Sequence, residues 1–197
     1  ALGDPSVPLE ARREVPAVLV RIGTVDAERA LLAGLLDADA PLRQRVIASL
    51  NKLKVRHPQV AIDPTAIELL LAAEIAGHYR SYQLLVPLDD EMVTAALRHS
   101  MEQELERIFR LMALVVPAPA LHDAYIGVRS SNPLVRANAL EYMENVLAPE
   151  LRDVLLPLID GQVSEEERAH LADRIIGARV ESSEQIVAAL LASDDPW

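Results

Sequence analysis

The chain of 197 residues contains no cysteine and only seven glycines, and aromatic residues make up just 3% of it. The lack of cysteine excludes disulfides, thiolate zinc sites and a cysteine nucleophile. The scarcity of glycine and aromatic residues argues against a β-sandwich or a glycine-rich nucleotide fold. Ala, Leu, Glu and Arg, which favour helices, dominate instead. The composition therefore predicts an all-α protein.

Sequence motifs of nucleotide-binding and hydrolytic sites are also missing. The chain has no Gly-x-x-x-x-Gly-Lys-Ser/Thr loop, no Gly-x-Gly-x-x-Gly turn and no Gly-x-Ser-x-Gly elbow. With so few glycines, little backbone can approach a phosphate closely. We therefore expect no enzymatic activity and no bound cofactor, and the sequence favours a binding domain.

Long hydrophobic runs are absent as well. The longest apolar runs, such as residues 69–73, are far shorter than the ~18 residues that cross a bilayer, so we expect no direct membrane insertion. The net charge of −11 disfavours a nucleic-acid partner, because binding to phosphates requires a basic surface. The charge is uneven: residues 1–60 hold nine Lys/Arg and seven Asp/Glu, whereas residues 61–197 hold ten and twenty-three. The simplest function of such an acidic surface is solubility.

What the chain does contain is a repeated helical pattern. In three segments apolar residues recur at every fourth position, and an arginine directly follows the first of them. The segments begin at Pro8, Asp39 and Asn132, and their arginines are Arg12, Arg43 and Arg136. Such a helix cannot bury its apolar stripe alone, so the copies must pack against neighbouring helices. The repetition predicts an α-solenoid of antiparallel helix pairs, with residues 1–197 forming a single domain.

Prolines, capping residues and apolar spacing predict about ten helices. Two long helices, residues 64–86 and 89–115, are expected to form an enlarged hairpin in the middle of the chain. Thr24 and the capping box of Ser164 and Glu167 mark two helix starts, and Pro16 is expected in the first turn of its helix. The shorter helices are expected at residues 12–22, 25–36, 41–54, 120–128, 133–146, 149–158, 164–176 and 182–191.

The segments that begin at Asp39 and Asn132 resemble the first-helix signature of HEAT repeats. They read Asp39-x-x-Leu42-Arg43-x-x-Val46 and Asn132-Pro133-Leu134-Val135-Arg136-Ala137-Asn138-Ala139-Leu140. In HEAT repeats an Asp and an Arg form a polar ladder between adjacent repeats. The resemblance implies that Asp39, Arg43, Asn132 and Arg136 are rungs of such a ladder, with Arg12 as a third arginine. Pro8 stands where the first repeat would need an acid.

Two longer stretches, residues 15–54 and 139–158, resemble part of a particular group of HEAT-like proteins. Together with the long hairpin, they are similar to the soluble region that follows the membrane part of bacterial relatives of ATP/ADP translocases. The resemblance implies that the chain is excised from a longer protein. It also implies a cytoplasmic location at the inner face of the membrane, and a partner that is either another protein or the covalently linked transporter. Transport itself would belong to parts outside this chain.

One group of polar residues in the expected hairpin allows a different interpretation. Glu74 and His78 lie one turn apart on the first helix and come roughly level with His99 and Glu102 on the second. Two histidines and two carboxylates could bind a divalent metal. However, His99-x-x-Glu102 reverses the Glu-x-x-His order of di-iron bundles, and Glu74 with His78 is an ordinary surface spacing. We therefore expect no metal.

The leading hypothesis is a non-catalytic interaction or regulatory domain, attached to a nucleotide-translocase-like membrane transporter. One alternative is an independent cytosolic scaffold that binds other proteins. The other alternative is a metal-binding or enzymatic helical protein that uses the central hairpin. The sequence identifies neither the partner nor the oligomeric state.

Overall fold

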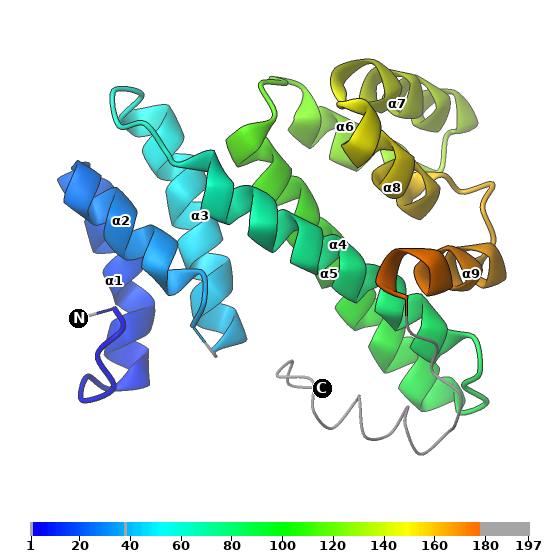
Figure 1. Ribbon diagram of the computed structural model, residues 1–197, viewed down its shortest axis with the longest axis horizontal. Helices are drawn as coiled ribbons and strands as arrows, with labels where there is room; N and C mark the ends of the chain where they lie inside the picture. The colour runs from blue at the N-terminus through cyan, green and yellow to red at the C-terminus, as the bar shows by residue number, and fades with distance from the viewer. Residues whose placement is uncertain (1, 38, 178–197) are drawn as a thin grey trace. The chain divides into compact units, whose positions relative to one another are not determined.

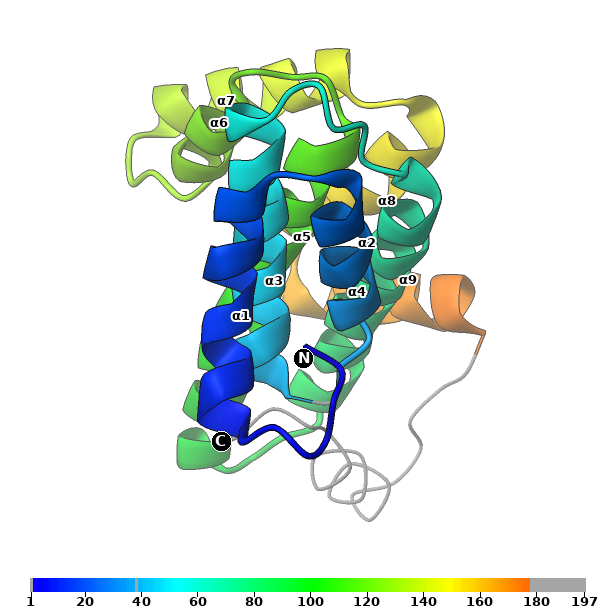
Figure 2. The same ribbon diagram turned by 90° about the vertical axis from the view of Figure 1, so that its left-hand side faces the viewer.

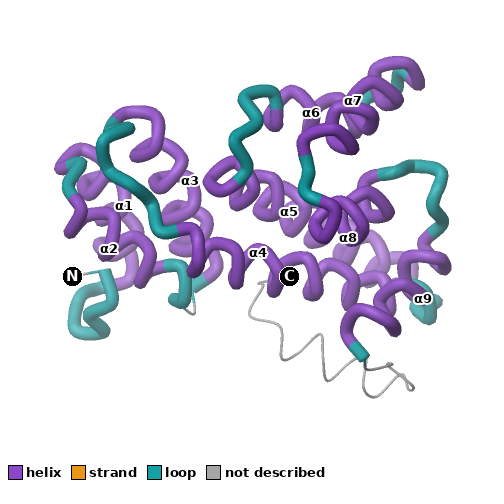
Figure 3. Tube along the Cα trace, turned by 45° about the horizontal axis from the view of Figure 1, so that its top comes forward, coloured by secondary structure: helices purple, strands orange, loops and turns teal. Residues whose placement is uncertain are grey.

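The computed structural model describes residues 2–37 and 39–177, and every regular element within them is an α-helix (Figures 1 and 3). The prediction of an all-α protein is therefore confirmed for this part of the chain. The helix expected at residues 182–191 lies outside it. The described helices are α1 (Leu9–Ile22), α2 (Val25–Gly34), α3 (Ala40–Arg56), α4 (Pro64–Leu85), α5 (Glu91–Val115), α6 (Leu121–Val128), α7 (Pro133–Val146), α8 (Pro149–Ile159) and α9 (Glu165–Ile176).

The chain divides into two compact units. The first takes in the residues up to Leu71 together with Arg110–Val115, and the second takes in Ala72–Phe109 and the residues from Val116 onward. The long helices α4 and α5 therefore each contribute to both units. Each unit is described by itself below.

The first unit is built on α1, α2 and α3, which lie side by side (Figure 2). Gly23 ends α1 in the left-handed conformation, with φ of 63°, and Thr24 begins α2 by accepting a hydrogen bond from the Ala27 amide, as predicted. At the far end of α3, the Lys54 ammonium group donates to the carbonyls of Ala113 and Leu114, both at 2.9 Å, in the last turn of α5. A cation at this position is favourable because the C-terminal end of a helix is partially negative. The fully buried core side chains include Leu31, Leu42, Val46, Leu50, Leu53 and Ile67.

The expectation that Pro16 lies in the first turn of its helix is wrong. Helix α1 begins at Leu9, three residues earlier than expected, so Pro16 lies in the helix interior. Proline has no amide hydrogen, so the Arg12 carbonyl lacks its usual intrahelical donor. The Pro16 ring is buried, and this apolar burial helps to offset the lost hydrogen bond.

In the second unit, α4 and α5 pair with each other, α6 packs on α7, and α7 packs on α8. Helix α7 has the predicted bounds, and Ser164 and Glu167 form the predicted capping box of α9. Tyr79 on α4 is fully buried and donates its hydroxyl to the Val154 carbonyl of α8, at 2.7 Å. Burial raises the pKa of Tyr79 to about 12. Its hydroxyl therefore stays a hydrogen-bond donor at any physiological pH.

Candidate functional site

A buried polar cluster joins α4 to α5 in the second unit. The His78 side chain is only 3% exposed, and its Nδ1 lies 2.8 Å from Oε2 of Glu104. Ser81 Oγ donates to the same carboxylate, 3.0 Å from Oε1. The rings of His78 and Tyr82 are nearly perpendicular, with their centroids 5.4 Å apart. Glu104 is therefore the centre of this cluster, and the sequence analysis did not select it.

The four metal-ligand candidates each have a different neighbour. Glu74 Oε2 lies 3.2 Å from Nε of Arg107, and Glu102 Oε2 lies 3.7 Å from Nη2 of Arg129. His99 Nε2 lies 3.1 Å from the Gln103 amide nitrogen. The structure thus does not bring Glu74, His78, His99 and Glu102 together. Among the described residues, no group of three or more His, Cys, Asp or Glu side chains is placed to hold a metal ion.

The buried cluster contains a serine, a histidine and a carboxylate, but its geometry differs from that of a catalytic triad. In a triad the histidine lies between the other two groups and takes the proton from the serine. Here both Ser81 and His78 bind the Glu104 carboxylate directly. This arrangement satisfies polar groups that are otherwise buried, and it holds α4 against α5.

Arg168 of α9 is a second connecting residue that the sequence analysis missed. Its guanidinium group donates to the carbonyls of Pro157, at 2.8 Å, and Asp160, at 2.7 Å, which lie at the end of α8. It also donates to the Tyr82 hydroxyl, at 3.1 Å, and lies over the Tyr82 ring, 5.1 Å from the centroid. Burial raises the pKa of Tyr82. Arg168 therefore links α4, α8 and α9 by charged hydrogen bonds.

In the first unit, two arginines of α1 bind two aspartates of the loop between α2 and α3. Arg13 holds both oxygens of Asp39, with distances of 3.0 and 2.8 Å. Arg12 pairs with Asp37 and donates through Nε to the Leu2 carbonyl, at 2.7 Å. The hydrogen bond from Arg13 lowers the pKa of Asp39 below its ordinary value, helped by the Leu42 amide. Asp39 thus binds Arg13, a residue that the sequence analysis did not select, and the charge of Arg43 also lowers the pKa of Asp39.

Arg43 and Arg136 lie in matching environments in the two units. The guanidinium group of Arg43 donates to the Asp37 carbonyl, at 2.7 Å, and that of Arg136 donates to the Ser130 carbonyl, at 2.6 Å. Each acceptor lies six residues before its arginine. Asp39 and Asn132 each accept a backbone amide in the first turn of the helix that follows, from Leu42 at 2.8 Å and Leu134 at 2.9 Å.

The match extends through a whole helix–loop–helix motif, residues 34–46 in the first unit and residues 127–139 in the second. The amides of Asp37 and Ser130 donate to the carbonyls of Gly34 and Gly127. The side chains of the same two residues accept the amides of Asp39 and Asn132, at 3.0 and 3.1 Å. A methyl group on Gly34 would lie 3.0 Å from Val46, and one on Gly127 would lie 2.7 Å from Ala139, the equivalent residue. The repetition in the sequence therefore corresponds to a repeated local structure.

The two copies of the motif differ in what covers them. Leu42 is completely buried, whereas its equivalent Val135 is 42% exposed. A methyl group on Gly34 would also lie 2.5 Å from Leu2, so the Leu2 side chain is seated against the first copy. In the second copy Val135 is the side chain nearest to Gly127 after Ala139. Ile126, Leu134 and Val135 are exposed by 56%, 68% and 42%, and we call these three residues the α6–α7 face.

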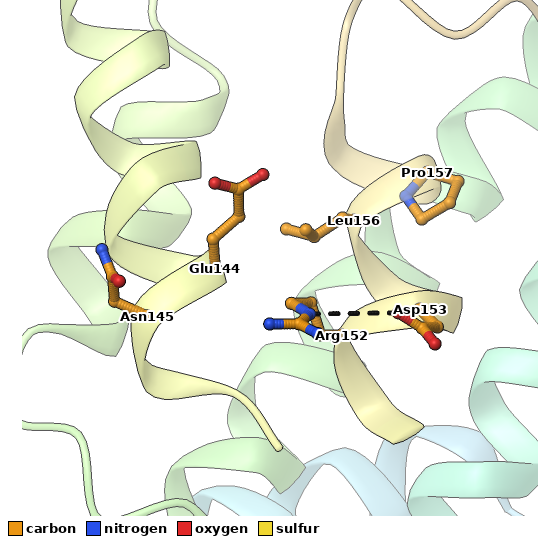
Figure 4. A pocket seen from close by; sticks show the side chains of 6 residues that line it. All are labelled: Glu144, Asn145, Arg152, Asp153, Leu156 and Pro157. Atoms are coloured by element: carbon orange, nitrogen blue, oxygen red, sulfur yellow. Dashed lines mark ion pairs between the residues drawn. The ribbon is translucent and has the colours of Figure 1, made fainter. Parts of the chain in front are cut away.

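A groove of about 590 Å³ lies between α7 and α8 (Figure 4). Six residues line it: Glu144, Asn145, Arg152, Asp153, Leu156 and Pro157. Arg152 and Leu156 extend from α8 toward α7, and Glu144 stands on the opposite wall (Figure 4). The volume lies within the range of small-ligand pockets, but the lining is mostly polar.

Comparison with known proteins found no match to any family model, curated protein or solved structure.

Asp39→Asn should make the protein less stable at neutral pH, with an effect that fades in acid. Asparagine can still cap α3, but it cannot form the ion pair with Arg13. Because the pKa of Asp39 is lowered in the folded state, the ionised carboxylate stabilises the fold above the ordinary aspartate pKa of about 3.9. That stability is lost as the pH falls through the lowered value. Melting temperatures of both proteins from pH 7 to about pH 2.5 would test this.

Asp26→Asn is the matched control, because Asp26 is a 94% exposed acid in the first turn of α2. Its effect should be small at every pH. A difference between the Asp39→Asn variant and the parent protein that stays constant down to the lowest pH would contradict the prediction.

Arg43→Ala and Arg136→Ala should each destabilise the protein, by about 1–2 kcal/mol. Each change removes a charged hydrogen bond to a carbonyl that is partly shielded from water. Chemical denaturation would measure the loss. Arg21→Ala is the control, since Arg21 is exposed on α1. Unchanged stability combined with the loss of a binding activity would mean that these arginines act in recognition.

Proposed function

We propose that this chain is a non-catalytic, HEAT-like interaction or regulatory domain that binds an amphipathic helix of a partner protein on the α6–α7 face. The observation that carries the proposal is the 42% exposure of Val135, at a position whose equivalent in the first unit, Leu42, is completely buried. Clustered exposed apolar side chains on a folded domain commonly mark interaction sites. Ile126 on α6 and Leu134 on α7 are exposed apolar side chains as well.

The first unit supports the choice of an amphipathic helix as the occupant. There α1 packs beside α3, and the ion pairs of Arg12 with Asp37 and of Arg13 with Asp39 hold it to the loop of the motif. An external helix in the equivalent place would cover Val135, whose equivalent in the first unit, Leu42, is buried. Docking an apolar helix face into an apolar surface is a common mode of recognition.

The loops of the two copies of the motif differ in charge. We therefore expect the helix that binds the second copy to differ in charge from α1. The aspartates 37 and 39 of the first copy correspond to Ser130 and Asn132 in the second. These side chains carry no charge, so a partner helix gains nothing from arginines in the positions of Arg12 and Arg13. The partner helix would therefore bind through apolar side chains, and the affinity should depend little on salt.

We also propose that the domain is the cytoplasmic module of a nucleotide-translocase-like membrane transporter. The resemblance of residues 15–54 and 139–158 supports this context, as does the slight excess of basic over acidic residues in residues 1–60. No described helix has the length and apolar character to cross a bilayer. Attachment to a membrane would then depend on a covalently linked domain. The reading frame on both sides of these 197 residues would test the link directly.

The purified chain should stay in the supernatant when it is mixed with anionic lipid vesicles at physiological salt. A basic residue near an anionic leaflet gains about 1 kcal/mol, but nine basic residues within the first sixty are offset by seven acids. The acidic remainder of the chain would be repelled. Co-sedimentation measures the bound fraction, and strong binding would instead indicate an autonomous membrane-surface protein.

Photo-crosslinking in cells tests the interaction itself. A photoreactive phenylalanine analogue is placed at Leu134 in the full-length protein, and the same analogue is placed at Val55 as the control. Val55 is also apolar and is 81% exposed, but it lies on α3. We expect one crosslinked protein at Leu134 and none at Val55, and we expect Val135→Asp to abolish the product. The purified partner should then bind the domain directly.

Two outcomes would overturn the proposal. One is the absence of any product at Leu134, and the other is the same product at Leu134 and Val55. Val135→Asp lies on the surface, so its melting temperature should stay close to that of the parent protein. A normal melting temperature would show that a lost product reflects lost binding.

A further inference from the structure

We propose that the groove between α7 and α8 binds an arginine side chain of an extended segment of a partner protein. The groove is lined by residues of α7 and α8, none of which belongs to the α6–α7 face, and its chemistry differs from that of the face. It is polar and rich in hydrogen-bond acceptors, whereas the α6–α7 face is apolar. The two sites can therefore be tested independently.

The first set of acceptors comes from α7. The carboxylate of Glu144 stands at the wall of the groove (Figure 4). The Asn145 amide group donates through Nδ2 to the Glu141 carbonyl, at 2.8 Å. This bond uses the donor end of the amide and leaves its oxygen as an acceptor for a ligand.

The second set of acceptors comes from α8, where Pro157 has an unusual position inside the helix. Because proline has no amide hydrogen, the Asp153 carbonyl lacks the intrahelical donor that would otherwise lie four residues later. The Asp153 carboxylate also lines the groove and is 77% exposed. The Asp153 carboxylate is therefore an exposed acceptor for a ligand that carries several N–H groups.

The charge and shape of the groove favour a guanidinium group on an aliphatic stem. The groove has two acidic side chains, Glu144 and Asp153, and one basic side chain, Arg152. Arg152 Nε lies 3.9 Å from Asp153 Oδ1, which is too far for a hydrogen bond. Leu156 and Pro157 provide an apolar surface against which the methylene groups of an arginine can pack. The planar guanidinium group has five donors and binds carboxylates and carbonyls at fixed angles. Residues 61–197 carry ten basic and twenty-three acidic residues, so the surroundings also attract a cation.

The test uses nuclear magnetic resonance titration of the whole chain with the peptide acetyl-Leu-Arg-Leu-Arg-amide. The control peptide replaces both arginines by citrulline, which has nearly the same shape and no charge. We expect the arginine peptide to shift the amide signals of Asn145, Asp153 and Leu156, and we expect the citrulline peptide to bind roughly tenfold more weakly, given two charged contacts. Increasing salt should weaken the arginine peptide alone.

Variants in the groove should change the affinity in opposite directions. Glu144→Gln and Asp153→Asn should each weaken the arginine peptide roughly two- to fivefold, whereas Arg152→Gln should strengthen it by a similar factor. Glu141→Gln is the matched control, because Glu141 is an exposed acid on α7 that does not line the groove. The Glu141→Gln variant should bind the arginine peptide with the same affinity as the parent protein.

Three results would overturn the inference. The first is equal binding of the two peptides, and the second is a loss of affinity in Glu141→Gln as large as that in Glu144→Gln, which would mean diffuse attraction to an acidic surface. The third is a concentration-dependent dimer of the chain that Glu144→Gln abolishes, since the occupant would then be a second copy. The absence of a crosslinked product at Leu134 would not affect this test, because the α6–α7 face and the groove consist of different residues.

Discussion

Glu104→Ala should lower the free energy of unfolding by about 3 kcal/mol, which is a large part of the stability of a typical domain. The substitution removes the shared acceptor of His78 and Ser81, whose side chains stay buried between α4 and α5. An unsatisfied buried polar group costs roughly 1–3 kcal/mol. This change leaves His78 without the carboxylate, whereas Ser81 can still donate to the Gly77 carbonyl, at 3.3 Å. Urea denaturation followed by circular dichroism would measure the loss.

Glu102→Ala is the matched control for this prediction, because it removes the same side chain from the same helix at the surface. Glu102 is 61% exposed and lies 3.7 Å from Arg129, so its loss should cost less than about 1 kcal/mol. Glu104→Gln should fall between the two variants, since an amide keeps one acceptor. Equal stabilities of the Glu102→Ala and Glu104→Ala variants would mean that the buried cluster does not hold the hairpin together. A metal that the parent protein binds and the Glu104→Ala variant does not bind would favour the metal-binding alternative.

The sequence was sufficient to predict most helix boundaries because their signals are local. Asn132 and Pro133 set the start of α7, and Ser164 with Glu167 set the start of α9. Both signals depend on residues within one turn of each other. Helix α1 was the exception. Its first turn lies before Arg12 and has no side-chain cap, since Pro8 occupies the N-cap position.

The contacts inside the long hairpin could not be predicted from spacing on the separate helices. His78 was expected to come roughly level with His99 and Glu102, but it meets Glu104. Two residues correspond to a rotation of about 200° around a helix, so Glu102 and Glu104 lie on nearly opposite faces. The rotation of α5 is set by what it buries, including Met101, Ile108 and Met112. Apolar spacing marks the buried face, but the residue opposite each polar side chain depends on the axial register of the two helices.

The polar ladder shows a second limit of sequence patterns. The pattern places Arg43 and Arg136 in equivalent positions, and each donates to a backbone carbonyl, that of Asp37 or Ser130. Every residue has a carbonyl group, so such an acceptor leaves no mark in the sequence. The pairing of Arg13 with Asp39 depends on α1 lying beside the start of α3, which is a tertiary contact. A feature that was overlooked is the glycine in each copy of the motif, Gly34 and Gly127, five residues before the cap.

Gly127→Ala should destabilise the protein by about 2 kcal/mol, even though alanine is the better helix former. The new methyl group would lie 2.7 Å from Cβ of Ala139, closer than two such atoms can approach. Both atoms are attached directly to helical backbone, so no side-chain rotation relieves the clash, and α6 must move away from α7. The gain in helix propensity, about 1 kcal/mol, offsets only part of this cost. Thermal and urea denaturation would both report the change.

Gly77→Ala should change the stability in the opposite direction, and it therefore separates the effect of packing from that of helix propensity. Gly77 also lies within a helix, α4, but nothing lies within 4 Å of the position of an added methyl group. Its replacement should therefore stabilise the protein by about 1 kcal/mol. The double variant Gly127→Ala with Ala139→Gly moves the methyl group from one helix to the other and removes the clash. The double variant should be more stable than the summed stability changes of the two single variants imply. If the stability changes were strictly additive, α6 and α7 would not meet at this point.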